Sequence, residues 1–317
     1  MIIDGMPAPV SESATALSGI AALPQLGAIR AQGEQAAAFL QGQLTQDVEA
    51  MAVGQARLAA YCNAKGRMLA SFVVCRRAEG EFWLVCSRDL LAPTLKKLSM
   101  FVLRAKVRLT DASDELAVYG LIGDAIDTVA AGARPSSVEG QNDADFLAPL
   151  PPADGAARAL WIGPTGRPPP AGPALSIELW DWAAVRSGVA TLTAPVAEAF
   201  VPQMLNYESV DGVSFKKGCY PGQEVVARSQ FRGAIKRRAY VGWVDGAAQA
   251  GQDVFAADDP AQPCGLIAQA AAAPAGGTAV IVCLPHALVE AGAPLRVGAA
   301  DGPPLTGLHQ PYPLIEV

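Results

Sequence analysis

Strand-like and helix-like segments follow one another closely in the first half of the chain, and their order limits the folds it can adopt. Residues 58–74 predict a hairpin, because two apolar runs flank a turn at 63–66 that ends in glycine. Residues 88–102 predict an amphipathic helix, since leucine and valine recur every three or four positions. A strand at 116–122 and a short helix at 124–131 follow. This order predicts an α+β fold of ferredoxin-like units rather than a doubly wound sheet.

The composition divides the chain into further segments. Residues 148–174 are rich in proline, glycine and alanine, which predicts a linker or extended crossover. It would join an N-terminal α+β part at 25–147 to a second part at 175–238. Short strand-like runs with glycine and proline turns at 239–317 predict a small C-terminal β-barrel. Residues 1–24 are interpreted as a loosely ordered leader.

Composition also excludes several classes of protein. No run of about 18 apolar residues exists, so no membrane span is expected, and the N-terminus lacks the pattern of a signal peptide. Six cysteines without any CxxC pair argue against a zinc ribbon or a disulfide framework and favour a reducing cytoplasm. With two histidines, no metal site is expected. Neither GxGxxG nor GxxxxGK[ST] occurs, so we expect no NAD and no ATP.

One window reverses the charge of the chain. Residues 215–238 contain seven cations and a single acid, about +6 by counting (7 − 1), whereas the whole chain is −6. Cys219 lies in this window directly after two lysines, and nearby cations favour the reactive thiolate form of a cysteine. A lone cysteine is also often a small buried apolar residue, and a basic run is often only a solvated face. The neighbouring residues favour chemistry: two glycines allow close approach, and Gln223 and Glu224 offer groups that match a flat heterocycle.

The segment KGCYPGQE at 217–224 resembles the K-G-C-[YF]-x-G-Q-E signature of the YgfZ family, folate-binding proteins related to the T-protein (aminomethyltransferase) of the glycine cleavage system. FLQGQLTQDV at 39–48 is similar to a second family segment, and the turn CNAKGR at 62–67 to a third. The resemblance covers about residues 25–317 and is strongest at 39–73 and 200–238.

The resemblance implies a T-protein-like module of ferredoxin-like units followed by a small β-barrel. It also implies that tetrahydrofolate or a related reduced folate binds, and that the protein is a cytoplasmic accessory factor for assembly or maintenance of iron–sulfur proteins. Cys219 would be the working thiol, assisted by Lys217, Gln223 and Glu224. The implied folate contacts are Gln43, Thr45, Asp47, Asn63, Lys65, Gln203, Asn206, Tyr220 and Arg228. Expected partners are folate and iron–sulfur client proteins but no DNA and no membrane, and the chain is expected to be a monomer.

Two other functions, aminomethyl transfer and nucleic-acid binding, each fit part of the sequence. A folate-dependent aminomethyl transferase shares the fold, but the related enzymes hold the pterin with a glutamate near a position where this chain has Arg186 and Ser187. A nucleic-acid binder could use the basic window, but the sequence pI of about 5.0 and the few aromatic residues among the cations count against it. One cysteine cannot hold a cluster alone, because iron–sulfur clusters usually take four thiolates.

Overall fold

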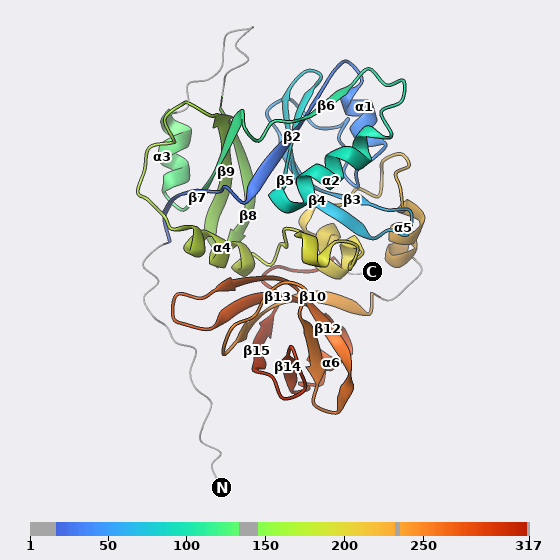
Figure 1. Cartoon of the computed structure of the whole chain (residues 1–317), viewed down its shortest axis with the longest axis vertical. Coiled ribbons are helices and arrows are strands. Elements are labelled where there is room, and N and C mark those ends of the chain that lie inside the picture. Colours follow the sequence, from blue (N-terminus) through green and yellow to red (C-terminus); the bar gives the residue numbers. More distant parts are fainter. Residues whose placement is uncertain (1–16, 133–144, 232–234, 316–317) are drawn as a thin grey trace.

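The structure, a computed structural model, describes residues 17–132, 145–231 and 235–315. Within these residues the chain forms two antiparallel sheets and a closed β-barrel. The two sheets lie side by side on one side of the molecule, and the barrel lies on the other (Figure 1). One helix and several short helical turns fill the layer between the sheets and the barrel. The α+β class and the C-terminal barrel are therefore confirmed.

The first sheet has the strand order β3-β4-β5-β2-β6. Its strands in this order are Ala56–Cys62, Met68–Ala78, Glu81–Ser87, Leu26–Gln32 and Arg108–Asp111. Helices α1 (Ala36–Gln41) and α2 (Arg88–Ser99) pack on it, and α2 buries Leu91 and Leu98 in the core of this part. The predicted hairpin and helix are confirmed, although the helix ends at Ser99, before the predicted end at residue 102.

The second sheet, ordered β1-β7-β9-β8, corrects the predicted linker. Residues 148–164 belong to a hairpin of β8 (Phe146–Ala153) and β9 (Ala156–Pro164), joined by a two-residue turn of Asp154 and Gly155 with positive φ angles of 46° and 84°. The prolines of β8 are tolerated because β8 is an edge strand and needs hydrogen bonds on one side only. Six consecutive residues of β9, from Arg158 to Gly163, are buried. Proline content alone therefore suggested a linker where the chain builds a sheet.

The remaining strands of this sheet correct the predicted leader. Strand β1 (Gly19–Ala22) lies inside the range 1–24 and pairs with β7 (Leu116–Ile122). The rest of the predicted leader, residues 1–16, lies outside the described residues. Helix α3 (Ala125–Gly132) follows β7 as predicted and covers the outer face of the sheet (Figure 1).

Helix α4 (Ile177–Arg186) joins the three layers. Trp180 and Ala183 pack with residues of both sheets, and Val185 packs with barrel residues. Three 3-10 turns follow it, at Ala194–Val196, Pro202–Leu205 and Tyr207–Val210, and α5 (Gln223–Phe231) completes this part.

The barrel closes in the order β10-β13-β12-β11-β14-β15, so it leaves no free sheet edge. Its strands in sequence order are Arg237–Val244, Asp253–Ala256, Asp259–Ala272, Thr278–Pro285, Leu295–Val297 and Pro304–His309, and a short helix, α6 (His286–Glu290), follows β13. Its interior is filled by aliphatic side chains. In the part of the chain that the structure describes, no helix is both long and apolar enough to cross a membrane.

The packing of α4 against the second sheet depends on one glycine. A Cβ atom at Gly120 of β7 would lie 2.4 Å from Trp180 Cε3. We expect Gly120→Ala to lower the free energy of unfolding by about 2 kcal/mol, because the indole cannot move without disturbing the packing between sheet and helix. Urea denaturation measures this change.

The matched control is Gly42→Ala, where the nearest atom to a new Cβ is 3.5 Å away and φ is −78°. This variant should be as stable as the wild type or more stable by less than about 1 kcal/mol. Equal losses in the two variants would show that the indole does not need the space at Gly120.

Candidate functional site

The loop that carries Cys219 is pressed against the turn of the β3–β4 hairpin. Gly222 has a φ of 80°, and a Cβ there would lie 2.4 Å from the carbonyl oxygen of Asn63 and 2.6 Å from Gly66 Cα. The two segments therefore meet backbone to backbone, which only glycine permits. Cys219 itself is exposed at the surface. Two of the family-like segments are thus neighbours in space although about 155 residues separate them.

Lys217 attaches the Cys219 loop to the family-like segment at 39–48. Its side chain is only 8% exposed, and Nζ donates hydrogen bonds to the carbonyl oxygens of Gln41 and of Leu44, the latter at 2.6 Å. The ammonium also lies 4.7 Å from the centre of the Tyr220 ring, a cation–π contact. Burial lowers the pKa of Lys217 to about 8. The structure gives Lys217 the role of an anchor, whereas the sequence suggested assistance to the thiol.

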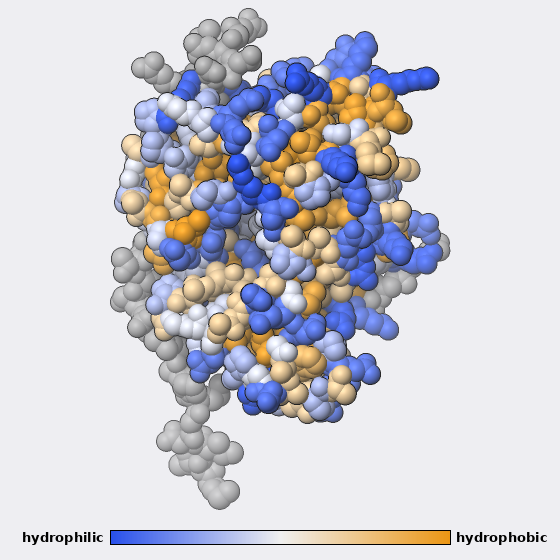
Figure 2. Space-filling view, in the orientation of Figure 1, coloured by the Kyte–Doolittle hydropathy of each residue, from blue (hydrophilic) through white to orange (hydrophobic). Residues whose placement is uncertain are grey.

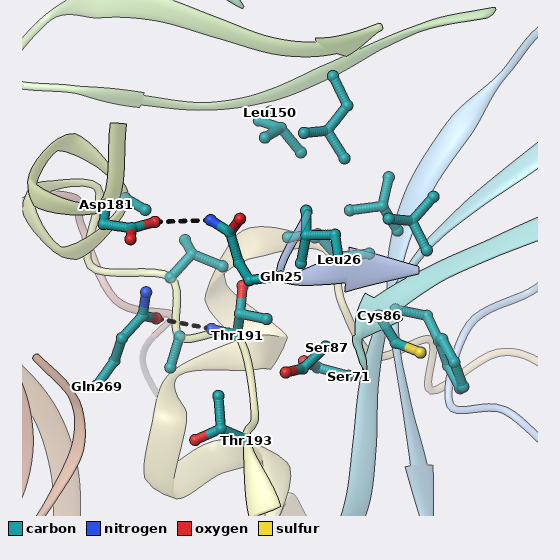
Figure 3. Close-up of a pocket in the computed structure, with 18 of the residues that line it drawn as sticks. Gln25, Leu26, Ser71, Cys86, Ser87, Leu150, Asp181, Thr191, Thr193 and Gln269 are labelled. Carbon is teal, nitrogen blue, oxygen red and sulfur yellow. Dashed lines mark hydrogen bonds between the residues drawn. The ribbon is translucent and has the colours of Figure 1, made fainter. Parts of the chain in front are cut away.

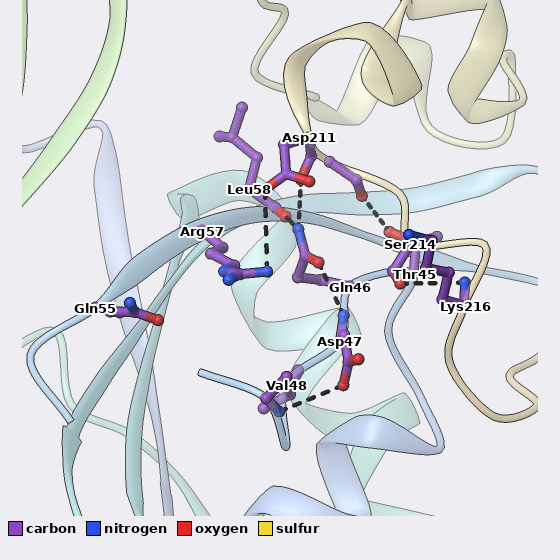
Figure 4. A network of polar contacts seen from close by, with 12 residues as sticks. Thr45, Gln46, Asp47, Val48, Gln55, Arg57, Leu58, Asp211, Ser214 and Lys216 are labelled. Carbon is purple, nitrogen blue, oxygen red and sulfur yellow. Dashed lines mark hydrogen bonds and ion pairs between the residues drawn. The ribbon is translucent and has the colours of Figure 1, made fainter. Parts of the chain in front are cut away.

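The polar residues of the 39–48 segment also serve the backbone (Figure 4). Thr45 is fully buried; Oγ1 donates to the Gly212 carbonyl at 2.7 Å and accepts from the Ala60 amide at 2.8 Å. The neighbouring Gln46, which the sequence analysis did not single out, donates to the carbonyl oxygens of Leu58 and Asp211. Thr45 therefore has no hydrogen-bonding capacity that points to a ligand.

Three further candidates also form hydrogen bonds with the backbone. The buried amides of Gln203 and Asn206 donate to the carbonyl oxygens of Val226 and Ala239, respectively. Among the described residues, their side-chain oxygens, Gln203 Oε1 and Asn206 Oδ1, have no hydrogen-bond partner. Asn63 holds the hairpin turn, since its Oδ1 accepts from the amides of Lys65 and Arg67.

The other candidates divide between the interior and the surface. Tyr220 is buried, and burial raises the pKa of its hydroxyl. Asp47 accepts a hydrogen bond from Gln41 at 2.9 Å. Gln43 is half-buried, and among the described residues its Oε1 has no hydrogen-bond partner. Lys65, Glu224 and Arg228 are exposed, and the last two form an ion pair at 3.1 Å within α5. These candidates therefore differ in accessibility: Tyr220 is buried, whereas Lys65, Glu224 and Arg228 face solvent.

A cavity of about 490 Å³ lies elsewhere, where α4 and both sheets meet the barrel (Figure 3). Its wall contains apolar residues of both sheets and a set of polar side chains from α4, β9, β12 and the turn before β2. None of the nine residues predicted to contact folate lines this cavity, and neither does Cys219. The predicted folate contacts therefore do not lie in this cavity.

The cavity wall holds charged groups with unsatisfied hydrogen-bonding atoms. Arg158 on β9 is 6% exposed, and its guanidinium lies 4.6 Å from the Trp180 ring centre. Asp181, which also lines the cavity, accepts a hydrogen bond from Gln25 Nε2 at 3.0 Å. Among the described residues, Arg158 Nε and Gln25 Oε1 have no hydrogen-bond partner. Burial lowers the pKa of Arg158 to about 10 and raises the pKa of Asp181. Buried polar atoms without protein partners are costly, so water or a ligand group is expected beside them.

The sequence contained a weak signal for these residues. Arg158 begins the apolar run RALWI, and Asp181 interrupts the apolar run of α4, LWDWAAV. A single charge within a buried run is uncommon unless it is paired or functional. The run RALWI lies within the predicted linker at 148–174, where the charge of Arg158 would not be unusual.

Thr45 offers a test of its structural role. Thr45→Val keeps the shape of the side chain and leaves the Ala60 amide and the Gly212 carbonyl without partners. We expect the free energy of unfolding to fall by about 3 kcal/mol, measured by urea denaturation. Thr45→Ser keeps the hydroxyl and should lose about 1 kcal/mol through the missing methyl group. Equal losses in Val and Ser variants would contradict the hydrogen-bonding role.

Lys217 offers a test that depends on pH. The folded protein releases the Lys217 proton above about pH 8, whereas the unfolded chain keeps it up to about 10.5. The unfolded state thus binds more protons in this window, so this group makes the free energy of unfolding rise with pH there. We expect Lys217→Met to remove that rise and, at pH 7, to speed amide hydrogen exchange in residues 216–222.

Lys216→Met is the matched control, because Lys216 is exposed and its described hydrogen bond uses only the backbone amide, which donates to Ser214. This variant should keep both the pH dependence and the exchange rates of the wild type. A Lys217→Met protein that also kept both would show that the loop is held by other contacts.

Comparison with known proteins agrees with this architecture. The family model described as the GCVT N-terminal domain matches residues 13–141. In overall fold the chain is similar to the crystal structure of glycine cleavage system aminomethyltransferase T from Bartonella henselae, with a TM-score of 0.69 over 93% of this chain and 86% of that chain, at 15% identity. The T-protein-like fold expected from the sequence is therefore confirmed.

Curated relatives identify the family. The tRNA-modifying protein YgfZ of Colwellia psychrerythraea is 31% identical over 235 residues, which is 69% of each chain. The protein of the same name from Photorhabdus laumondii is 32% identical over 266 residues, 76% of this chain and 74% of that one. With this identity over more than two thirds of both proteins, and with the T-protein fold, the chain belongs to the YgfZ family.

Proposed function

We propose that this protein is a tetrahydrofolate-binding accessory factor for the assembly or maintenance of iron–sulfur proteins. Folate binds in the cavity beside α4, and Cys219 works on the surface. The observation that carries the folate assignment is the cavity itself, whose wall combines the Trp180 ring with the polar groups of Arg158, Asp181 and Gln25. The T-protein fold supports the same ligand class.

The cavity suits the pterin ring of a folate. A pterin is flat and presents N–H donors next to a carbonyl acceptor along one edge. Asp181 and Gln25 Oε1 supply acceptors for such donors, and Arg158 supplies donors for such a carbonyl. The volume of about 490 Å³ lies within the usual range of small-molecule sites. Bound tetrahydrofolate would supply a carrier for one-carbon groups, and these residues would orient and hold it.

Cys219 serves a different step in this proposal. The thiol is exposed, lies outside the cavity wall, and is carried on a loop that Lys217 and Gly222 hold rigidly. A rigid, accessible thiol can meet a client protein directly. Because clusters usually need four thiolates, Cys219 would supply one sulfur contact and the client the others. Gln223 and Glu224, in the first turn of α5, are proposed to contact the same client.

The names of the relatives narrow the proposed client. Those proteins are called tRNA-modifying. We therefore place the client among iron–sulfur enzymes that modify tRNA, with this protein acting on the enzyme. A second candidate, aminomethyl transfer to folate, is favoured only by the shared fold. Turnover of an aminomethylated carrier protein would favour the transferase, and it would leave Cys219 without a role.

The folate proposal is tested by titrating the protein with tetrahydrofolate and following tryptophan fluorescence. Trp180 lines the cavity and should report binding directly. We expect saturable quenching, and we expect Asp181→Asn and Arg158→Met each to raise the dissociation constant at least about tenfold, since each removes a charged hydrogen-bonding group.

Two controls make this test selective. Arg186→Met removes an arginine that instead pairs with Asp154 at 2.7 Å outside the cavity, and it should leave the affinity unchanged. Cys219→Ala should also bind folate normally and lose only support of the client enzyme. Absence of saturable binding in the wild type would refute the folate assignment, and loss of binding in Cys219→Ala would place the thiol in the folate site.

A further inference from the structure

The connection between α2 and β6 exposes an unusual set of apolar side chains. Met100 is 68% exposed, Phe101 48% and Leu103 88%. Val102 and Ala105, between and beside them, pack into the core of the first sheet and fix the connection in place. The connection forms a corner of the molecule far from the barrel (Figure 1), and hydrophobic atoms gather at this corner with hydrophilic atoms around them (Figure 2). We call Met100, Phe101 and Leu103 the apolar tip.

Folding does not account for leucine at position 103. Its φ angle is 42°, in the left-handed region that side chains other than glycine and asparagine adopt at a cost. Its side chain is almost completely exposed, so it contributes little packing in return. Strained, exposed residues of this kind are typical of contact sites.

Cations flank the apolar tip along the chain. Residues 93–109 contain five basic side chains and no acidic one, in a chain whose net charge is −6. All five are exposed, and one of them, Lys106, pairs with Glu34 at 2.6 Å. The other four are Lys96, Lys97, Arg104 and Arg108. The local charge is therefore about +4 (5 − 1), counting Glu34. The surface fits an occupant that is both anionic and able to accept apolar side chains.

We infer that the apolar tip docks the protein on an anionic lipid surface. Three apolar side chains on a projecting corner offer far less than the area of about 800 Å² per partner that a stable protein interface needs. A bilayer needs no complementary shape: apolar side chains enter the boundary of the acyl chains while lysine and arginine meet the headgroups. A nucleic acid is a poorer match, since Phe101 is the one aromatic side chain of the tip on which a base could stack.

The arrangement implies reversible binding that depends on salt. Insertion of three apolar side chains would bind a membrane weakly, and so would the attraction of a few basic residues to anionic headgroups. Together the two contributions strengthen binding, as in peripheral proteins that combine them. The barrel lies at the opposite end of the molecule and would face away from the lipid (Figure 1). Docking through the tip would thus leave the barrel free for other contacts.

The test is flotation of the purified full-length protein with lipid vesicles. We expect binding to vesicles of phosphatidylcholine with about one third phosphatidylglycerol, little binding to pure phosphatidylcholine, and release when salt rises from about 0.1 to about 0.5 M. Leu103→Asn should reduce binding at least tenfold while the melting temperature stays equal or rises, because asparagine tolerates the left-handed backbone. A Lys96→Glu and Lys97→Glu double variant should also lose binding.

Ile315→Asn is the matched control, since Ile315 is also exposed (48%) but lies near the C-terminus. It should bind vesicles like the wild type. The proposal is overturned if the wild type does not float with anionic vesicles, if it binds neutral vesicles equally, or if Leu103→Asn binds normally. It is also overturned if the wild type dimerises in solution and Leu103→Asn abolishes that dimer, because the tip would then join two copies of this chain.

Discussion

The position of the Trp180 indole governs both the fold and the cavity. On one side the ring packs against the backbone of Gly120, where even a methyl group would clash, and the guanidinium of Arg158 lies against it at 4.6 Å. The first contact seats α4 on the second sheet. The second holds a buried cation at the cavity wall, and burial lowers the pKa of that cation to about 10. Helix α4 also packs against the barrel, so a displaced Trp180 ring would disturb the packing of both sheets and of the barrel.

Helix α2 and the β3–β4 hairpin could be predicted because their sequence patterns span only a few consecutive residues. The spacing of leucines in α2 and the glycine turn of the β3–β4 hairpin were sufficient, because each is a property of a few consecutive residues. The β8–β9 hairpin was missed although Asp154-Gly155 is a strong turn signal, because the prolines around it argued for a linker. Only the pairing of β9 with β7 shows that β8 is an edge strand, where proline is harmless.

The candidate site could be predicted only in part, because contacts between residues far apart in the sequence cannot be read from local patterns. The basic window and the KGCYPGQE motif predicted Cys219 as a functional residue. In the structure it is exposed, on a loop that contacts the other family-like segments. The roles of Thr45, Gln203 and Asn206 could not be read from the sequence, because their hydrogen-bond partners lie between 15 and 167 residues away along the chain. A polar side chain in a family-like segment can equally hydrogen-bond to distant backbone or contact a ligand. The cavity residues Arg158 and Asp181 come from different elements, and only the packing of α4 brings them together.

The exposure of Cys219 has a consequence for how this protein meets oxidants. Of the six cysteines, four are buried, Cys264 is half-buried, and Cys219 alone is exposed. Burial raises the pKa of Cys62, Cys86 and Cys283 to about 12, so these three remain unreactive thiols. The folded chain therefore offers one fully exposed sulfur for exchange, and four of the other five sulfurs are buried in the interior. Oxidation can end in a single mixed disulfide with a small thiol or with one other chain, and the covalent assembly stops there.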